Sequence, residues 1–398
     1  MVTDVRLAEL VAEFGSPAYV LELADIRRAH ADLRRALPAR AELAYSVKAN
    51  PNPALVSELV SLGCWCEVSS SGEIDAVRAA GAPAQRLLYT GPGKTERDVL
   101  AALRAGIRWY SVESYREFEV LAAHAARDEV WLLPRLRLER PPPAAIVMSA
   151  GQGHFGMPVE EFAAIVSAAG PHRVKGLHWF VASNVTDVAA LAALYRAEID
   201  AWAALPEPVP DGLLALGGGF PHPMGRPRPD LPGDLADEVE RALRESRDQP
   251  PDTLLFESGR YLVNGCGTLL CTVLDVKRRG GRDVAVLDAG IHVLGGLAAL
   301  GRALRSPLAP RVASRADEPP TTVYDLVGPL CTPIDTLARA VALPALCPGD
   351  LLAIPDVGAY GQTASVSGFL SRPGAVEVVL DGDRAVHASR VTVTRTEA

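Results

Sequence analysis

Short apolar segments alternate with amphipathic stretches along the first two thirds of the chain. The apolar segments are rich in β-forming residues and end at Gly, Ser or Pro turns, whereas the stretches between them carry apolar residues three or four positions apart. This alternation predicts strands followed by helices. The expected strands are residues 43–47, 64–68, 86–90, 108–112, 130–138, 174–181, 213–216 and 253–257. The expected helices include residues 54–62, 73–80, 95–105 and 159–169.

Strands that alternate with helices indicate parallel pairing, and eight such units are enough to close a barrel. We therefore predict an α/β fold with a (β/α)8 TIM-type barrel over residues 25–256. Beyond it the apolar positions change to a period of two, which predicts a mainly antiparallel β domain formed by residues 1–24 and 257–398. Its expected strands are residues 268–276, 283–288, 322–327, 351–354, 376–380 and 386–393. Residues 303–321, rich in Pro, Arg and Ser, are expected to form a surface loop.

Length and charge narrow the functional classes. A chain of 398 residues exceeds what one core usually holds, so two domains are expected. The formal net charge of -8 and a pI near 5.6 indicate no basic face for nucleic acid. The N-terminus lacks the pattern of a signal peptide, and no apolar run is long enough to cross a bilayer. We therefore expect a cytoplasmic protein without membrane contact.

Six cysteines stand at positions 64, 66, 266, 271, 331 and 347. They show neither the paired spacing of a zinc site nor a dense disulfide pattern, so no metal is expected. Five of the thiols are interpreted as reduced and mostly buried. Cys331 is the exception because of the motif that surrounds it.

Reactive residues recur at the ends of the expected strands, where the chemistry of a (β/α)8 barrel gathers. Lys48 follows the first strand, Ser183 the sixth, Gly217 to Gly219 the seventh, and Glu257 to Arg260 the eighth. A lysine at the end of a buried strand is costly to desolvate as an ammonium, and this favours its use as a Schiff-base amine. For Lys48 taken alone, an exposed loop lysine is an equal alternative.

The last two strand ends suggest an anion site. The glycines of LALGGGF let backbone N–H groups approach a phosphate, although a triple glycine also suits a tight turn. Arg260 of the next motif, ESGR, supplies a cation for the same phosphate or forms a surface salt bridge. Glu257 ends an apolar run, where a carboxylate needs a partner. It either faces a protonated pyridine nitrogen or pairs with an arginine such as Arg137.

Six motifs in this order, YSVKAN, GLHWFVAS, LGGGF, ESGR, GPLCTPID and DVGAYG, resemble the fold-type III pyridoxal-phosphate (PLP) decarboxylases. The resemblance runs from about residue 17 to the end of the chain. This family includes diaminopimelate, ornithine and arginine decarboxylases and is similar in architecture to alanine racemase. The resemblance implies PLP as the cofactor and a head-to-tail homodimer with shared active sites.

The resemblance also implies roles for the matching residues. Lys48 would hold the cofactor as a Schiff base, Glu257 would contact its pyridine nitrogen, and Cys331 would reach the partner's site and return a proton to the product. Asp335 would orient Cys331. The residues expected to contact the cofactor are Lys48, His178, Phe180, Ser183, Gly217, Gly218, Gly219, Glu257, Gly259, Arg260 and Tyr360, and those expected to contact the substrate are Cys331, Thr332 and Tyr360.

Some positions depart from the family pattern. Phe180 stands where relatives commonly carry a histidine stacked on the cofactor, and an aromatic ring can still stack there. Ser258 replaces the proline of the usual EPGR motif, and His154 stands where a lysine or arginine often precedes Phe-Gly. By strand alternation His178 lies on the same side as Phe180, as a ligand-facing residue or a hydrogen-bonded core histidine.

Thr332 bears on the substrate. In branches that act on diamino acids the residue after the catalytic cysteine is usually acidic and pairs with the distal ammonium, which Thr332 cannot do. The CTPxD form resembles a branch of secondary metabolism, of the siderophore or antibiotic type, that carries its amino acid as a conjugate. We therefore expect an α-decarboxylase whose substrate is a conjugated, carrier-bound or otherwise modified amino acid.

Other functions stay open. They are a diaminopimelate-type decarboxylase of free amino acids, an amino-acid racemase on the same barrel, a non-catalytic PLP-binding regulator and a phosphate-binding sugar enzyme. Glu257 and Cys331 favour decarboxylation over racemisation, since alanine racemases place an arginine at the ring nitrogen. Retention of Lys48 together with Cys331 argues against a silent regulator, and a sugar enzyme gives that pair no role.

Overall fold

The structure of the protein is a computed structural model. It describes residues 2–125, 130–139, 146–148, 153–170, 173–187, 189–205, 212–247, 250–295, 308–313, 315 and 318–397. The chain divides into two compact units. The barrel unit consists of Arg28–Pro221 and Pro229–Leu262, and the β unit consists of Met1–Arg27, His222–Arg228 and Val263–Ala398.

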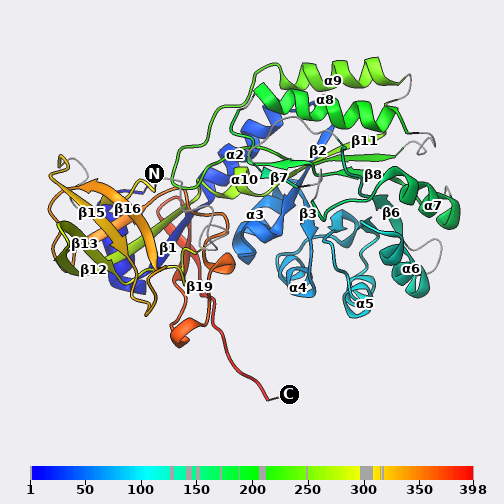
Figure 1. The fold of residues 1–398 in the computed structure, drawn as a ribbon. Coiled ribbons are helices and arrows are strands. Elements are labelled where there is room, and N and C mark those ends of the chain that lie inside the picture. Colours follow the sequence, from blue (N-terminus) through cyan, green and yellow to red (C-terminus); the bar gives the residue numbers. More distant parts are fainter. Residues whose placement is uncertain are drawn as a thin grey trace. The chain divides into compact units, whose positions relative to one another are not determined.

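The barrel unit is built on a sheet of eight parallel strands (Figure 1). The strands are β2 (Ala41–Ser46), β3 (Trp65–Val68), β4 (Leu87–Tyr89), β5 (Trp109–Val112), β6 (Trp131–Pro134), β8 (Gly176–Trp179), β10 (Leu213–Leu216) and β11 (Thr253–Ser258). Their order in the sheet is β6-β5-β4-β3-β2-β11-β10-β8. Parallel bridges from Leu132 to Val174 and from Arg135 to His178 join the two ends. The sheet therefore closes, and the predicted barrel is confirmed with each expected strand present.

Helices flank the strands of this unit in Figure 1. They are α2 (Leu23–Ala36), which begins in the β unit, α3 (Pro53–Ser61), α4 (Ser71–Ala79), α5 (Glu96–Arg104), α6 (Tyr115–His124), α7 (Val159–Ala169), α8 (Ala189–Ala203), α9 (Leu235–Ser246) and α10 (Arg260–Val263). Capping side chains explain where α3 to α6 begin. Asn52, Ser70, Thr95 and Ser114 each accept a hydrogen bond from a backbone N–H of the first turn that has no partner within its helix.

Apolar side chains from the strands pack together in the barrel unit. This buried cluster consists of Ala44, Trp65, Leu88, Leu133, Leu213, Ala215 and Leu255, with Trp109 packed against it. Glycine is required where backbones approach closely. A Cβ on Gly218 would lie 1.9 Å from the carbonyl oxygen of Glu257, so a glycine there lets the chain after β10 pack on β11. A separate two-stranded sheet pairs β7 (Ile146–Val147) with β9 (Ala182–Ser183).

The β unit carries a nine-stranded sheet among its described residues. Its elements are α1 (Asp4–Phe14), β1 (Ala18–Glu22), β12 (Gly267–Arg279), β13 (Arg282–Leu287), β14 (Arg311–Val312), β15 (Thr322–Val327), β16 (Thr336–Leu343), β17 (Leu351–Ile354), β18 (Val376–Asp381) and β19 (Arg384–Arg390). Most neighbours are antiparallel, but β1 pairs parallel with β18 and β13 with β15. The predicted mainly antiparallel β domain is confirmed.

The β unit differs from the sequence prediction in three places. Strand β14 pairs with β17, so the expected loop over 303–321 contains a strand, while residues 303–307, 314 and 316–317 lie outside the described residues. Strand β16 was not predicted, because register shifts opposite β15 interrupt its period of two. Strand β19 ends at Arg390, before the expected position 393, and the described residues that follow are largely exposed.

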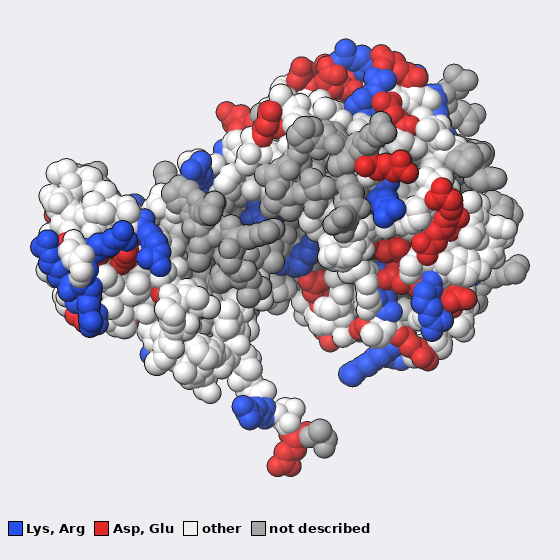
Figure 2. Space-filling view, in the orientation of Figure 1, with Lys and Arg blue, Asp and Glu red and all other residues white. Residues whose placement is uncertain are grey.

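Charged side chains of opposite sign are interspersed over α8 and α9 (Figure 2). Arg196 pairs there with Asp200 and Glu245, and Arg241 pairs with Glu238. These ion pairs join neighbouring turns and the two helices. Among the described residues, no helix combines the length and the apolar character needed to cross a membrane.

Candidate active site

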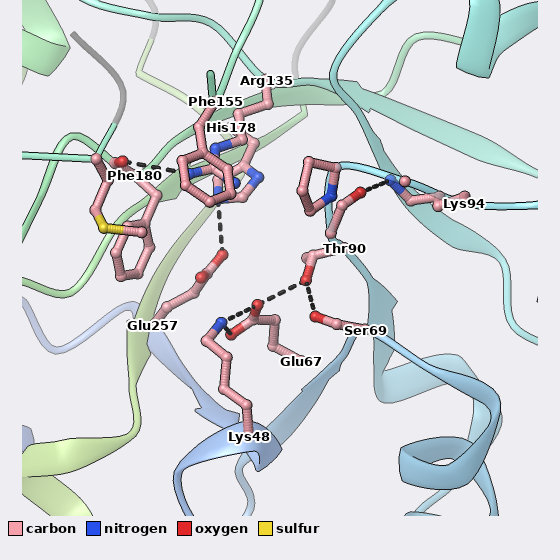
Figure 3. A pocket seen from close by; sticks show the side chains of 14 residues that line it. Lys48, Glu67, Ser69, Thr90, Lys94, Arg135, Phe155, His178, Phe180 and Glu257 are labelled. Atoms are coloured by element: carbon pink, nitrogen blue, oxygen red, sulfur yellow. Dashed lines mark hydrogen bonds and ion pairs between the residues drawn. The ribbon is translucent and has the colours of Figure 1, made fainter. Parts of the chain in front are cut away.

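A cavity of about 520 Å³ lies at the carboxyl ends of the barrel strands. Its volume is within the range of about 300–1,000 Å³ typical of small-molecule pockets. The cavity is lined by Lys48, Glu67, Ser69, Thr90, Gly91, Pro92, Gly93, Lys94, Arg135, Met148, Phe155, His178, Phe180 and Glu257. Figure 3 shows these side chains. They follow or end different strands, so closure of the barrel assembles the pocket.

Lys48 lies in the short 3₁₀ turn η1 (Val47–Ala49) that follows β2. Its Nζ donates hydrogen bonds to both carboxylate oxygens of Glu67, at 2.6 and 2.8 Å (Figure 3). The Lys48 side chain is 41% exposed. Of the two alternatives that the sequence left open, a desolvated amine and an exposed loop lysine, neither describes Lys48 fully, since it keeps contact with solvent and has a carboxylate partner in the pocket.

Glu67 is a buried acid on β3, with 3% exposure. Burial alone would raise its pKa, but the charge and hydrogen bonds of Lys48, helped by neighbouring hydroxyls, lower the pKa of Glu67 to about 2. Thr90 Oγ1 donates to Glu67 Oε1 at 2.6 Å, and Ser69 Oγ lies 2.9 Å from Thr90 Oγ1. Glu67 is therefore an anion that holds the Lys48 amine in place.

Glu257 is the second-last residue of β11, at the carboxyl end of the strand. Its side chain is 1% exposed. Its Oε1 is 2.9 Å from Nε2 of His178 on β8, and Nδ1 of His178 is 2.7 Å from the hydroxyl of Ser111 on β5. The His178–Glu257 contact is short but not aligned as a hydrogen bond, and both carboxylate oxygens are buried without one. In the described part of the chain, the side chain that faces the Glu257 carboxylate is thus His178 and not Arg137.

A second buried acid, Glu198 on α8, is electrostatically coupled to Glu257. Burial, with a smaller contribution from the charge of Glu257, raises the pKa of Glu198 well above its ordinary value. Glu257 therefore contributes to the electrostatic environment of this second buried acid.

Lys94 and Arg135 line the pocket away from Lys48 (Figure 3). Lys94 Nζ donates to the carbonyl of Gly91 at 2.6 Å and to Glu117 at 3.1 Å. Burial lowers the pKa of Lys94, although the charge of Glu117 opposes this shift. Arg135 donates to Glu113 at 2.7 Å. These ion pairs neutralise both cations and fix the loops that carry them.

The pocket brings together four of the expected site residues: Lys48, His178, Phe180 and Glu257. The centroid of the Phe180 ring lies 5.7 Å from Lys48 Nζ, so an aromatic ring lines the pocket beside the amine. His178 both lines the pocket and makes a buried hydrogen bond to Ser111. His178 is thus a hydrogen-bonded core histidine that also lines the pocket, and its contact with a ligand stays a prediction.

Other expected residues of the barrel unit do not line this cavity. They are Ser183, Gly217, Gly218, Gly219, Gly259 and Arg260. Two of these glycines permit close packing behind it. A Cβ on Gly217 would lie 2.7 Å from the Cα atom of Phe180. A Cβ on Gly259 would lie 2.9 Å from the Cβ atom of Ala49. Phosphate binding by this group of residues stays a prediction.

The β unit holds the remaining expected residues, among them Cys331 and Asp335. Asp335 is buried and accepts hydrogen bonds from the backbone N–H groups of Ile291 and Leu330, both at 2.7 Å. Cys331 follows Leu330 and is exposed. The carboxylate thus orders, through its backbone, the loop that carries the cysteine, and orientation of the thiol by Asp335 stays a prediction.

Thr332 and Tyr360 are both half-buried in the β unit. Thr332 Oγ1 accepts a hydrogen bond from the backbone N–H of Ile334 at 3.5 Å. Tyr360 has a φ of 56°, in the left-handed region that a residue with a Cβ adopts only at a cost of about 1–3 kcal/mol. The surrounding fold must offset this cost, which marks the DVGAYG turn as a position under constraint.

The other cysteines fit the expectation except one. Cys64, Cys66, Cys266 and Cys271 are buried, whereas Cys347 is exposed. Burial raises the pKa of Cys64 and of Cys66 to about 12, which makes these thiols unreactive. Within the described ranges, no group of three or more His, Cys, Asp or Glu side chains is placed to hold a metal ion.

Among the pocket residues that the sequence pattern did not predict are Glu67, Thr90, Lys94, Arg135 and Phe155. Glu67 carried a usable signal, because an acid in the apolar strand WCEV needs a partner once it is buried. Lys94 also carried a usable signal, because it is the lysine of a glycine-containing loop, GPGK, that follows a strand. Arg135 falls within an apolar run and gave no comparable signal.

We expect Glu67→Gln to lower the free energy of unfolding by about 1–2 kcal/mol at pH 7, since the charge-assisted bonds to a partly exposed Lys48 are lost. The pKa of Glu67 in the folded protein, about 2, is below its ordinary value of 4.5. The difference in the free energy of unfolding between the parent and Glu67→Gln should therefore be full above about pH 4.5 and shrink as the pH falls toward 2. Urea unfolding across this range measures it.

Glu245→Gln is the matched control for this measurement, because Glu245 forms an ion pair whose acid side chain is 50% exposed. Its effect should stay within about 0.5 kcal/mol at every pH. A Glu67→Gln protein as stable as the parent at pH 7 would show that the Lys48–Glu67 pair does not stabilise the fold.

The fold and the pocket together define the class of the protein. A (β/α)8 barrel joined to a mainly antiparallel β unit is the alanine-racemase-like architecture, and this one carries an amine and a buried carboxylate in one pocket. Residues 23–264 match the family model described as "Pyridoxal-dependent decarboxylase, pyridoxal binding domain". The chain belongs to this family of PLP-dependent decarboxylases.

Individual relatives match nearly the whole chain. It is 33% identical to the diaminopimelate decarboxylase of Pseudomonas aeruginosa, over 97% of this chain and 92% of that protein. It is 27% identical to the decarboxylase of L-glutamyl-BtrI acyl-carrier protein from Niallia circulans, over 94% of this chain and 91% of that protein. A crystal structure of diaminopimelate decarboxylase from M. jannaschii is 25% identical and superimposes with a TM-score of 0.83, covering 96% of this chain and 92% of that one.

The residues of the pocket fit PLP. Glu257 offers two buried carboxylate oxygens that lack an aligned hydrogen bond, and a protonated ring nitrogen is a donor of the kind they need. Lys48 presents a primary amine to the same cavity, and Phe180 presents an aromatic ring. The chemistry of the donor set therefore agrees with the cofactor of the family.

Proposed function

We propose that this decarboxylase removes the α-carboxylate of a free amino acid of the diaminopimelate type. The observation that carries the proposal is the match to the diaminopimelate decarboxylase of P. aeruginosa, which extends over nearly the full length of both proteins. The conjugated substrate expected from the sequence has less support, because it depends on one short motif, the CTPxD form that contains Thr332, whereas this match extends over the chain.

The pocket residues divide the work in this proposal. Lys48 would hold the cofactor through its amine, and Glu67 would keep that amine in place whenever it is free. Glu257 would face the ring nitrogen and retain its proton. When bound, PLP supplies a conjugated ring that accepts the electrons left when carbon dioxide departs. Gly217 to Gly219, Arg260 and Tyr360 are proposed to hold its phosphate.

Cys331 is proposed as the acid that protonates the α-carbon after decarboxylation. A thiol with an ordinary pKa near 8.5 is a competent donor to a carbanion. Cys331 is exposed, and the neighbouring Ile334 side chain is 61% exposed, although it is large and apolar. We propose that a second subunit covers this loop and that Cys331 serves the partner's site, which makes the protein a homodimer with shared active sites.

A second candidate, decarboxylation of an amino acid attached to a carrier, is favoured by a specific observation. Thr332 brings no charge to the position beside the proposed acid, so it offers no ion pair to the distal ammonium of a diamino acid. The relative from N. circulans is named for a carrier-bound glutamyl substrate. This candidate keeps every proposed role of Lys48, Glu257 and Cys331.

Carbon dioxide release from the PLP-loaded enzyme distinguishes these candidates. We expect meso-diaminopimelate to be decarboxylated with a kcat/KM at least about 10²-fold above lysine, ornithine and arginine, because a site that binds the distal carboxylate of diaminopimelate rejects substrates that lack this group. Turnover of a glutamyl carrier thioester without turnover of any free amino acid would establish the second candidate instead. Loss of the α-proton without carbon dioxide would indicate a racemase, and bound PLP without any turnover would indicate a regulator.

A further inference from the structure

His178 is a buried histidine whose two ring nitrogens face different partners. Nδ1 lies 2.7 Å from Oγ of Ser111, and Nε2 lies 2.9 Å from Oε1 of Glu257. His178 and Glu257 are each 1% exposed, and Ser111 is fully buried. Because the three residues come from β8, β5 and β11, their contacts connect strands that are not neighbours in the sheet.

The surroundings assign the proton of a neutral His178 ring to Nε2. A proton on Nδ1 would leave the lone pair of Nε2 facing the Glu257 carboxylate at 2.9 Å, which is repulsive. With the proton on Nε2, the ring donates toward Glu257 and the Ser111 hydroxyl donates to Nδ1. Ser111 therefore favours the tautomer in which His178 is a donor to the carboxylate.

Glu257 can accept a further donor in this arrangement. Oε1 and Oε2 are both buried, and among the described residues neither has an aligned hydrogen bond. A buried carboxylate in that condition costs free energy until a donor reaches it. Glu257 and His178 both line the pocket, so the donor can come from a molecule bound there.

We infer that His178 is a positioning residue that acts on the cofactor through Glu257. It holds the carboxylate directed at the ring nitrogen, and Ser111 fixes the orientation of the histidine. The inference rests on the proposed role of Glu257 and is independent of which amino acid is the substrate. Its consequence is that the protonation of the bound ring depends on His178, a residue that need not touch the cofactor.

The chemical shift of the ring nitrogen in bound ¹⁵N-labelled PLP tests the inference. We expect the parent protein to show a protonated nitrogen and His178→Leu to shift toward the unprotonated value. His178→Gln, whose amide can donate near the position of Nε2, should retain most of the parent shift. His178→Asn, whose shorter amide lies nearer Ser111, should resemble His178→Leu.

The kinetic expectation has the same cause. His178→Leu should lower kcat by about 10- to 100-fold with little change in KM. This is the range found when a residue that hydrogen-bonds to a metal-ligating side chain is removed, and His178 supports Glu257 in the same way. His178→Gln should recover most of this loss. A histidine that only packs the core would alter stability without moving the nitrogen shift.

Further variants make the outcome decisive. Tyr110→Phe removes another buried hydroxyl from β5, next to Ser111, and should leave the shift unchanged, whereas Ser111→Ala should move it part of the way. A parent-like nitrogen shift in His178→Leu overturns the inference. If His178→Leu does not fold, a parent-like shift in both His178→Asn and Ser111→Ala overturns it instead. A parent-like shift in Glu257→Gln would overturn the proposed role of Glu257 itself, so the two failures are distinguishable.

Discussion

Replacing Lys48 with alanine should abolish both covalent attachment of PLP and decarboxylation. The Lys48 amine lies in the pocket, 2.6 and 2.8 Å from the carboxylate oxygens of Glu67, and its side chain retains 41% exposure, so a carbonyl group can reach it. Alanine offers no amine. Borohydride reduction of the PLP-loaded protein, followed by digestion and mass analysis, should find the pyridoxyl group on the Lys48 peptide of the parent and nowhere on the variant.

Two controls separate chemistry from folding in this experiment. Lys48→Arg keeps a cation opposite Glu67 but has no amine that condenses with an aldehyde, so it should fold like the parent and still lack attachment. Lys94→Met removes the other lysine of the pocket and should retain a pyridoxyl group on Lys48. A pyridoxyl group found on Lys94 in the parent protein would refute the assignment and, with it, the proposed roles around Lys48.

Replacing Cys331 with alanine should slow decarboxylation by about 10²- to 10⁴-fold while PLP remains attached. This range is typical for loss of a general acid, and the residual rate reflects protonation by water or another group. The product should also gain solvent deuterium with less stereochemical control. Single-turnover kinetics in deuterated water, with mass and chiral analysis of the product, measure both effects.

Cys347→Ala is the matched control for this variant, because Cys347 is the other exposed cysteine among the described residues. It should react like the parent. If subunits share their sites, mixing inactive Lys48→Ala and Cys331→Ala proteins should restore up to about a quarter of the parent activity, since half of the random dimers then carry one intact site. Parent-like rates and products in Cys331→Ala would show that another group supplies the proton.

The periodicity of the chain was enough to predict the architecture. Burial of one helical face and of whole parallel strands leaves a repeating apolar pattern, and that pattern placed all eight barrel strands to within a few residues. It failed at β16, where register shifts break the alternation that identifies a strand. It also interpreted as a loop the segment that contains β14, because two paired residues are too short to produce a period.

The sequence also placed several reactive residues at strand ends, and the structure gathers Lys48, His178, Phe180 and Glu257 in one pocket. The contacts of each of these side chains could not be predicted from the sequence. From the sequence, Lys48 was either a desolvated amine or an exposed loop lysine, whereas in the structure Glu67 on the neighbouring strand supplies it with a carboxylate partner. Asp335 was expected to orient Cys331, and the structure shows that it binds two backbone N–H groups, one of them on the preceding residue, Leu330.

These differences have one physical origin. Strand identity and strand ends follow from local composition and periodicity, which are properties of residues close together in the chain. The contacts of Lys48 with Glu67, and of His178 with Ser111 and Glu257, join residues 19 to 79 positions apart and depend on barrel closure, strand register and rotamers. The sequence by itself therefore determined the fold and the candidate chemistry, whereas only the tertiary structure decided which charges are paired, because pairing depends on distances across the barrel.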